Sequence, residues 1–277
     1  MISATDTARS LLAVALLSCT FTASARAAPH NAPRHTAPHA IKTRINPKDG
    51  AVMAYVHAGT FPMGSSEQEG FSEDHTQHTV YLDAFWIYEN DVMVAQYRKF
   101  CKATGRKMPL RPNWGWTDDH PIVSVTWDDA KAYCDWAEAS LPTEAQWEKA
   151  ARGADGRTFP WGDKWDRRKL RCSKKEFGDA GGTAPVGSYP RGASPYGCLD
   201  MVGNVLQWCA DWYDEDYYAH SPTRNPVGPA FGDERVERGG SWVSHLESNF
   251  RCANRGFGGP DGGNNGIGFR CVVRAGG

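Results

Sequence analysis

The sequence has almost no net charge and, beyond its first residues, no long hydrophobic run. Its 31 Lys and Arg residues nearly balance 32 Asp and Glu residues, and the formal net charge is −1. Without an excess of basic residues, we expect neither nucleic acid nor an anionic membrane surface as the main partner. No later stretch reaches the roughly 18 apolar residues that a membrane helix needs, so we predict no transmembrane span.

The motifs of the commonest enzyme classes are also missing. There is no Walker loop, no GxGxxG after a strand, no GxSxG, no HExxH and no CxxC. These absences exclude the mechanisms that those motifs define. His75 and His78 lie in a polar segment with no further ligand nearby at zinc spacing, and we interpret them as part of a surface loop.

The residues that are abundant favour a globular, turn-rich domain. The chain has 277 residues, of which 40% are hydrophobic and 23% charged, and it is long enough to bury a sizeable core. Its 11 Trp, 29 Gly and 17 Pro residues are typical of a protein held by many turns and irregular segments rather than by long helices.

The N-terminus has the pattern of an export signal. Arg9 precedes the apolar run 11–17, and small-residue cleavage patterns follow at 23–25 and 25–27. We therefore predict a signal peptide at 1–27, a Pro/Ala/His-rich linker at 28–48 and one domain at 49–277, exported to the periplasm, the cell surface or the medium. Residues 16–19 loosely fit a lipoprotein processing site, so a lipid anchor at Cys19 is the alternative. The linker residues His30, His35 and His39 are interpreted as a solvated tether rather than a metal site.

Eight cysteines are present, and removal of Cys19 with the signal leaves seven. In an oxidising compartment most cysteines pair, and an odd number leaves at least one thiol over. A leftover thiol that is buried behaves as a small hydrophobic group.

Local patterns predict a few regular elements. Strands are expected at 52–56, 59–65 and 78–87. Val94, Tyr97, Phe100 and Cys101 share one helical face, and Gly105 ends that helix. Two capping boxes, at 126–129 and 143–146, each open a helix. The expected inward-facing residues of these two helices are Ala130, Tyr133, Cys134 and Ala137, and Trp147, Ala150 and Ala151. Beyond about residue 153 periodicity fades.

Several segments in the same order resemble blocks of the formylglycine-generating enzyme (sulfatase-modifying factor) family. They are GTFPMGS at 59–65, AQYRKF at 95–100, HPIVSVTW at 120–127, LPTEAQWE at 141–148, FPWG at 159–162, GN at 203–204, RGGSW at 238–242 and GFRC at 268–271. Each block alone is weak, but the ordered set is specific and covers residues 50–274. The resemblance implies a compact α+β fold with little regular structure, related to the C-type lectin fold.

The resemblance also implies stabilising groups. The family pairs a helix cysteine with the cysteine of its terminal GFRC, which are Cys134 and Cys271 here. Closing so long a loop contributes about 4 kcal/mol. The pairing of Cys101, Cys172, Cys198, Cys209 and Cys252 stays open, since the usual partner position of Cys252 is Ala151. The family's calcium ligands match Asp200, Gly203, Val205 and Gln207, all oxygen donors, so we expect a structural Ca²⁺ there. A turn satisfied by hydrogen bonds is the alternative. A second calcium site is poorly matched, with Asp179 its one plausible ligand.

The chain departs from the family at the catalytic centre. Family enzymes have two cysteines there, whose thiolates bind copper(I). Ser244 stands at the first cysteine position and Ser248 or Asn249 at the second, while Ser241 and His245 are retained. A serine hydroxyl does not replace a thiolate at copper(I), so we expect no copper and assign no catalytic residue. Ser244 and His245 are adjacent and lack an orienting carboxylate, which argues against a nucleophile–base pair.

Two classes of function follow. The first is a ligand-binding or accessory protein for a peptide, protein or small molecule, with Trp242, His245, Phe250, Arg255 and Phe257 as contact residues. For Trp242 and Phe250 the alternative role is core filling. In a sharper form, the C-terminal segment resembles the variable region of retroelement-diversified display proteins, with the varied positions Val243, Ser244, His245, Leu246, Ser248, Asn249, Phe250, Gly256, Phe257 and Gly258.

The second class is an enzyme of altered chemistry. Some exported relatives without the cysteine pair take part in the oxidative maturation of secreted peptides, including siderophore precursors. In such an enzyme His245, with Glu247 or Arg255, would serve as acid and base. This hypothesis rests on analogy, and we favour binding.

Overall fold

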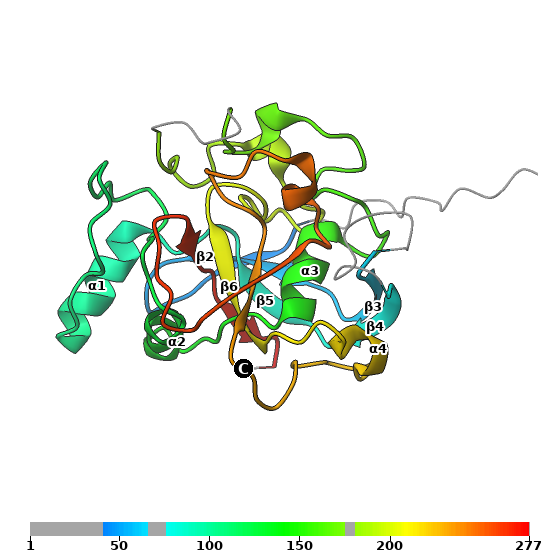
Figure 1. The fold of residues 1–277 in the computed structure, drawn as a ribbon. Coiled ribbons are helices and arrows are strands. Elements are labelled where there is room, and N and C mark those ends of the chain that lie inside the picture. The colour runs from blue at the N-terminus through cyan, green and yellow to red at the C-terminus, as the bar shows by residue number, and fades with distance from the viewer. Residues whose placement is uncertain (1–40, 66–75, 175–180, 277) are drawn as a thin grey trace, which may run out of the picture. The chain divides into compact units, whose positions relative to one another are not determined.

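The computed structural model describes residues 41–65, 76–174 and 181–276 (Figure 1). All of the described residues belong to one compact unit. The predicted signal peptide, the lipid-anchor residue Cys19 and the linker histidines lie outside the described residues, as do His75 and Asp179.

Within these described ranges, three small sheets form the framework. The first has the order β1 (Thr43–Ile45), β2 (Val52–Val56), β5 (Phe85–Tyr88) and β10 (Val272–Arg274), with antiparallel neighbours. The second pairs β3 (Gly59–Met63) with β4 (His78–Leu82). The third has the order β8 (Arg255–Gly258), β7 (Arg235–Arg238), β6 (Leu206–Trp212) and β9 (Ile267–Gly268), and its β6–β9 pair is parallel.

Helices are few and short. They are α1 (Val94–Thr104), α2 (Trp127–Trp136), α3 (Glu144–Arg152) and α4 (Tyr217–His220), with the 3-10 turns η2 (Arg167–Lys169), η3 (Pro190–Gly192) and η4 (Glu247–Phe250). The predicted capping boxes are present. The Thr126 hydroxyl accepts from the Asp129 N–H and the Thr143 hydroxyl from the Gln146 N–H. The predicted α+β fold with little regular secondary structure is confirmed.

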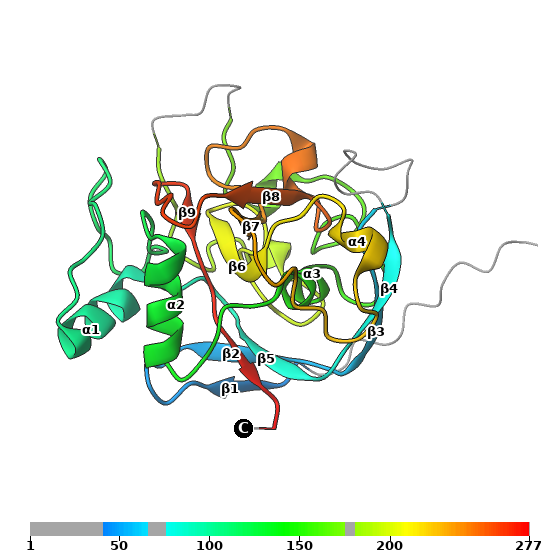
Figure 2. The same cartoon turned by 60° about the horizontal axis from the view of Figure 1, so that its bottom comes forward.

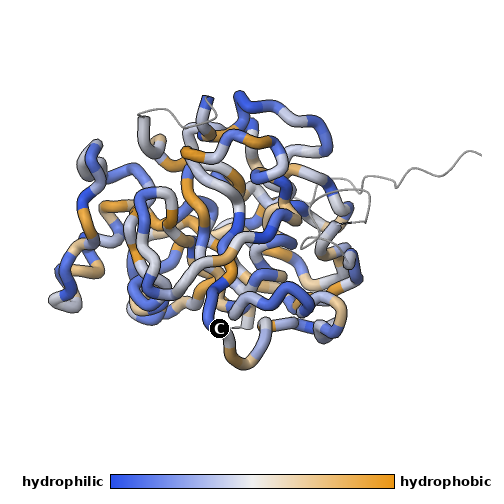
Figure 3. The backbone as a smooth tube through the Cα atoms, in the orientation of Figure 1, coloured by the Kyte–Doolittle hydropathy of each residue, from blue (hydrophilic) through white to orange (hydrophobic). Residues whose placement is uncertain are grey.

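Helix α3 lies between the sheets and contacts β3, β4, β6 and β7 (Figure 2). This position explains why it has almost no exposed side chain: Trp147, Ala150 and Ala151 are all 0% exposed. The predicted inward face of α2 is confirmed in the same way, because Ala130, Tyr133, Cys134 and Ala137 are 0% exposed. Apolar segments concentrate in the interior and hydrophilic ones follow the outer loops (Figure 3).

Two expectations about boundaries differ from the structure. The stretch 78–87 is not one strand, because the chain leaves the β3–β4 pair after Leu82 and enters the first sheet at Phe85. Residues 43–48, assigned to the linker, belong to the folded unit. Here β1 pairs with β2, and the Asn46 side chain donates to Tyr88 Oη at 2.8 Å. This short strand lacks the alternation that would have identified it.

Candidate functional site

The predicted contact region begins at the end of β7, where two glycines turn the chain. Gly239 and Gly240 have φ of 98° and 64°, a region that favours glycine. A Cβ at Gly239 would lie 2.6 Å from the Met201 carbonyl oxygen, and one at Gly240 would lie 2.9 Å from that of Asn249. The RGGSW block is therefore needed for this turn, which directs Ser241 and Trp242 inward and the following residues outward.

Trp242 supports the turn from inside. Its ring is 7% exposed, packs edge-to-face against Trp114 with centroids 5.1 Å apart, and donates from Nε1 to the Asn265 carbonyl oxygen at 2.9 Å. Its N–H donates to the Asn204 carbonyl oxygen at 2.9 Å. A tryptophan held in this way positions the loop, and its ring is not available as a contact surface.

The segment 243–249 is the exposed part of the region, and we call it the 243–249 loop. Val243 and Leu246 are 42% and 52% exposed, and His245 and Glu247 are also exposed. Ser248 and Asn249 of η4 are half-buried. The loop thus presents a mixed apolar and polar surface, with two exposed aliphatic side chains next to an imidazole in sequence.

The serines do not form a nucleophilic site. The Ser244 Oγ accepts from the Ser241 N–H at 3.1 Å, and the Ser244 carbonyl oxygen accepts from the Ser173 N–H at 2.9 Å. Ser241 is 1% exposed. Within the described residues, no hydrogen bond joins His245 to Ser244, Glu247 or Arg255. The triad geometry that would activate a hydroxyl is therefore absent from that part of the chain.

Phe250 belongs to an aromatic cluster under the loop. It is 0% exposed and stacks on Trp165, with ring centroids 5.5 Å apart. Trp165 and Trp161 are half-buried, and Lys169 lies 5.6 Å from the Trp161 ring centroid. Trp161 and Trp165 thus present aromatic surface next to η4, and sequence reasoning did not identify them. The FPWG block contains Trp161 and was the available signal.

The two remaining predicted contact residues have different environments. Arg255 is 5% exposed and binds Glu144 through Nε at 2.8 Å and Nη2 at 3.2 Å. Although burial opposes it, the charges of Arg255 and Arg238 hold the pKa of Glu144 below its usual value. Phe257 is 48% exposed and stacks on Tyr213, with centroids 4.2 Å apart. Of the five predicted contact residues, His245 and Phe257 are exposed, whereas Trp242, Phe250 and Arg255 are packed in the interior.

The predicted calcium ligands form a different kind of centre. The Gln207 Oε1 accepts from Trp147 Nε1 at 2.8 Å and from Arg270 Nε at 2.7 Å. Its Nε2 donates to the carbonyl oxygens of Asp200 and Met201 at 2.9 and 3.3 Å. An amide oxygen has two lone pairs, and both are occupied by donors, one of them cationic. Gln207 therefore does not fit the role of a calcium ligand.

Of the other predicted calcium ligands, Asp200 and Gly203 are fixed by the hydrogen bonds and the backbone conformation of the turn. An Asp200 carboxylate oxygen accepts from the Gly187 N–H at 2.6 Å, and burial raises the pKa of Asp200. Gly203 has a φ of 80°, and a Cβ there would lie 2.6 Å from the Arg171 carbonyl oxygen. Within the described residues, no group of three or more His, Cys, Asp or Glu side chains could hold a metal ion. The alternative of a hydrogen-bonded turn fits this arrangement.

The seven described cysteines are all buried thiols. Cys134 Sγ and Cys271 Sγ are 3.0 Å apart, so the expected partners are neighbours, and their disulfide stays a prediction. Cys252, the cysteine nearest in sequence to the 243–249 loop, is 0% exposed, and burial raises its pKa to about 12. A protonated, buried thiol does not replace the missing copper(I) thiolates.

The chain is similar to known proteins in both sequence and fold. The sulfatase-modifying factor enzyme 1-like domain model matches residues 39–275. The formylglycine-generating enzyme of Streptomyces coelicolor is 35% identical over 77% of this chain and 86% of its own length. That of Mus musculus is 39% identical over 80% and 74%.

The fold is likewise similar to a known structure. The structure of PvdO from Pseudomonas aeruginosa has a TM-score of 0.74 and 24% identity, and covers 83% of this chain and 97% of its own. The chain belongs to the family of sulfatase-modifying factor enzyme 1-like domains, and its fold is that of the formylglycine-generating enzymes.

Proposed function

We propose that the chain is an exported ligand-binding or accessory protein that has the fold of the formylglycine-generating enzymes without their copper chemistry. The observation that supports it most strongly is the composition of the 243–249 loop. Ser244 and Ser248 or Asn249 stand where family enzymes have thiolates, and no exposed cysteine lies within the described residues. The loop instead presents Val243, His245 and Leu246, which are suited to contact rather than to electron transfer.

A finer proposal is that this surface varies between copies of the gene. Of the ten positions that resemble a variable segment, Val243, His245, Leu246 and Phe257 are exposed, and only Phe250 is buried. Side chains on such positions change without loss of the core. Sequencing of the downstream DNA tests the idea: a near-copy of the segment that differs at adenines supports it, and the absence of one overturns it.

The binding proposal is tested with glycan and peptide arrays probed with the purified protein. We expect hits that are lost in the double variant Val243→Ser, Leu246→Ser. The matched control is Leu110→Ser, Phe231→Ser, because these two residues are 83% and 85% exposed elsewhere on the surface. Hits that survive the first variant, or an array without hits, would contradict recognition through this loop. Turnover of an arrayed peptide would favour the enzyme of altered chemistry instead.

Export is proposed from the N-terminal pattern. Expression of the full chain, followed by fractionation and N-terminal sequencing, should give a mature protein outside the cytoplasm that begins near residue 28. A cytoplasmic protein that retains Met1 would contradict this proposal. In addition, no helix within the described residues is long and apolar enough to cross a membrane.

A further inference from the structure

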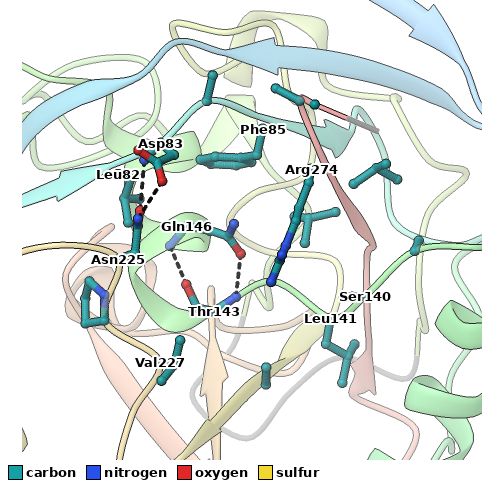
Figure 4. A pocket seen from close by; sticks show the side chains of 18 of the residues that line it. Leu82, Asp83, Phe85, Ser140, Leu141, Thr143, Gln146, Asn225, Val227 and Arg274 are labelled. Carbon is teal, nitrogen blue, oxygen red and sulfur yellow. Dashed lines mark hydrogen bonds between the residues drawn. The ribbon is translucent and has the colours of Figure 1, made fainter.

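A cavity of about 890 Å³ opens where β4, β5 and β10 meet the loop before α3, away from the 243–249 loop (Figures 1 and 4). It lies between the ends of elements that are far apart in the sequence: residues 82–85, 138–146, 225–227 and 272–276. Its volume is within the range of small-molecule sites, about 300 to 1,000 Å³. Neither the proposed function nor the family comparison assigns a role to it.

One wall of the cavity is apolar. Leu82, Phe85 and Leu141 are core residues, 2%, 1% and 5% exposed, and their side chains point to the cavity from three different segments (Figure 4). At the rim Val227 is 66% exposed. A ligand with a short hydrocarbon body would cover Val227 and take its apolar surface out of water, which is favourable.

Other residues of the lining provide hydrogen-bond donors. Arg274 extends from β10 toward Gln146 at the start of α3 (Figure 4). Gln146 Oε1 accepts a hydrogen bond from the Thr143 N–H at 3.0 Å, so the NH₂ group of Gln146 remains as a donor. Ser140, just before Leu141, is a further polar residue of the lining. Its N–H and carbonyl oxygen pair with Val272 at 2.9 and 2.8 Å, which fixes its hydroxyl beside the cavity.

The lining contains two acidic side chains, Asp83 and Glu138, and one basic side chain, Arg274, which differ in their partners. Asp83 accepts from Arg224 at 2.6 Å and from Asn225 Nδ2 at 2.7 Å, and Glu138 faces Lys48 at 3.9 Å. Both acidic groups of the lining thus have partners. Within the described residues, the Arg274 guanidinium has neither an ion pair nor a hydrogen bond. A guanidinium beside an amide NH₂ and a hydroxyl is a donor set that matches a carboxylate.

From the apolar wall and the uncompensated guanidinium together, we infer that this cavity binds a small organic acid, with its carboxylate on Arg274 and Gln146 and its hydrocarbon body on Phe85, Leu141 and Val227. The backbone of both donors is fixed, because Arg274 ends β10 and Gln146 lies in the first turn of the capped helix α3. A free small acid is the occupant, because the cavity is of small-molecule size.

Calorimetric titration of the full chain with hexanoate and phenylacetate tests this inference. We expect dissociation constants of about 1 mM, typical of ligands with so few atoms. The neutral analogues hexanamide and phenylacetamide should bind at least about tenfold more weakly, because they lose the charge-assisted hydrogen bonds. Equal binding of acids and amides, or no binding of either acid, would overturn the inference.

Variants locate the site. Arg274→Gln should weaken binding about tenfold and Arg274→Lys less, whereas Arg98→Gln, an equal charge change on α1, should have no effect. Val227→Glu should also weaken binding through its like charge, and Leu110→Glu should not. Unchanged melting temperatures confirm folding.

If Arg274→Gln binds like the wild type, the site is elsewhere. If a short peptide with a free C-terminus binds and the small acids do not, the occupant is a protein terminus and the inference is wrong.

Discussion

At the residue scale, a single side-chain atom, Gln207 Nε2, changes the predicted calcium site into a hydrogen-bonded centre. Its Nε2 donates to the carbonyl oxygens of Asp200 and Met201, and its Oε1 accepts from Trp147 and Arg270. The position was predictable from the ordered motifs, but its hydrogen bonds were not. Arg270 is distant in sequence, and only the packed fold places its guanidinium against this amide.

The replacement Gln207→Glu should create a calcium requirement. A carboxylate oxygen in place of Nε2 would face the carbonyl oxygens of Asp200 and Met201, and these three oxygens would repel one another without a cation between them. The variant should melt at a lower temperature in EDTA and recover in calcium, while the wild type melts at the same temperature in both. A wild-type protein that calcium stabilises, and that loses this effect in Asp200→Asn, would contradict this account.

Glu237 predicts a dependence of stability on pH. Burial, aided by the charge of Glu234, raises the pKa of Glu237 to about 7. Between its ordinary pKa of 4.5 and about 7, the folded state holds a proton that the unfolded state has released. The free energy of unfolding therefore falls as pH rises through this window. Urea denaturation across pH 4 to 8 should show this fall and a smaller one in Glu237→Gln. An unchanged slope in that variant would contradict the assignment.

At the element scale, the elements that local interactions define were predicted from the sequence, and those that depend on distant partners were not. Helices α2 and α3 were predicted because a capping box and one apolar face are local signals. Strands β6 to β9 were not predicted, since their pairing depends on partners far along the chain. The segment 78–87 resembled one strand because alternation continues across the point where the chain changes sheets.

The ion pairs of α3 hold this helix against the third sheet. Glu144 binds Arg255 of β8, and Glu148 binds Arg238 of β7 and Arg152. Arg255→Met leaves the buried Glu144 without the guanidinium that donates two hydrogen bonds to it, and should lower the free energy of unfolding by about 3–5 kcal/mol. Arg98→Met removes an exposed pair with Asp118 and should cost at most about 1 kcal/mol. Urea denaturation measures the free energy of unfolding of both variants. Equal losses in the two would show that the ion pairs of α3 do not hold the helix in place.

At the scale of the whole molecule, β10 closes the domain. It pairs with β5 in the first sheet, and Cys271, just before it, lies against Cys134 of α2. The ordered motifs along the chain sufficed to predict the fold, because the blocks that define it occur in the family's order. The ligand surface was less predictable, since Trp242, Phe250 and Arg255 are buried by residues distant in sequence.

In an oxidising compartment, Cys134 of α2 and Cys271 next to β10 should form a disulfide. The mature protein purified from an oxidising compartment should have a Cys134–Cys271 disulfide and five thiols rather than the seven described. Its reduction should lower the free energy of unfolding by about 4 kcal/mol. Peptide mapping by mass spectrometry and denaturation with and without reductant check both points. Seven free thiols in the exported protein would contradict the prediction.

The most direct test of the central claim is a titration with copper(I) against a competing chelator under reducing conditions, followed by oxygen uptake with a cysteine-containing peptide. The wild type should show neither specific copper binding nor peptide-dependent uptake, because the loop has hydroxyls where copper(I) needs thiolates. The double variants Ser244→Cys, Ser248→Cys and Ser244→Cys, Asn249→Cys serve as positive controls, and one of them should gain copper binding. Tight one-to-one copper binding by the wild type, with oxygen uptake, would contradict the claim and show that other residues have rebuilt the oxidase.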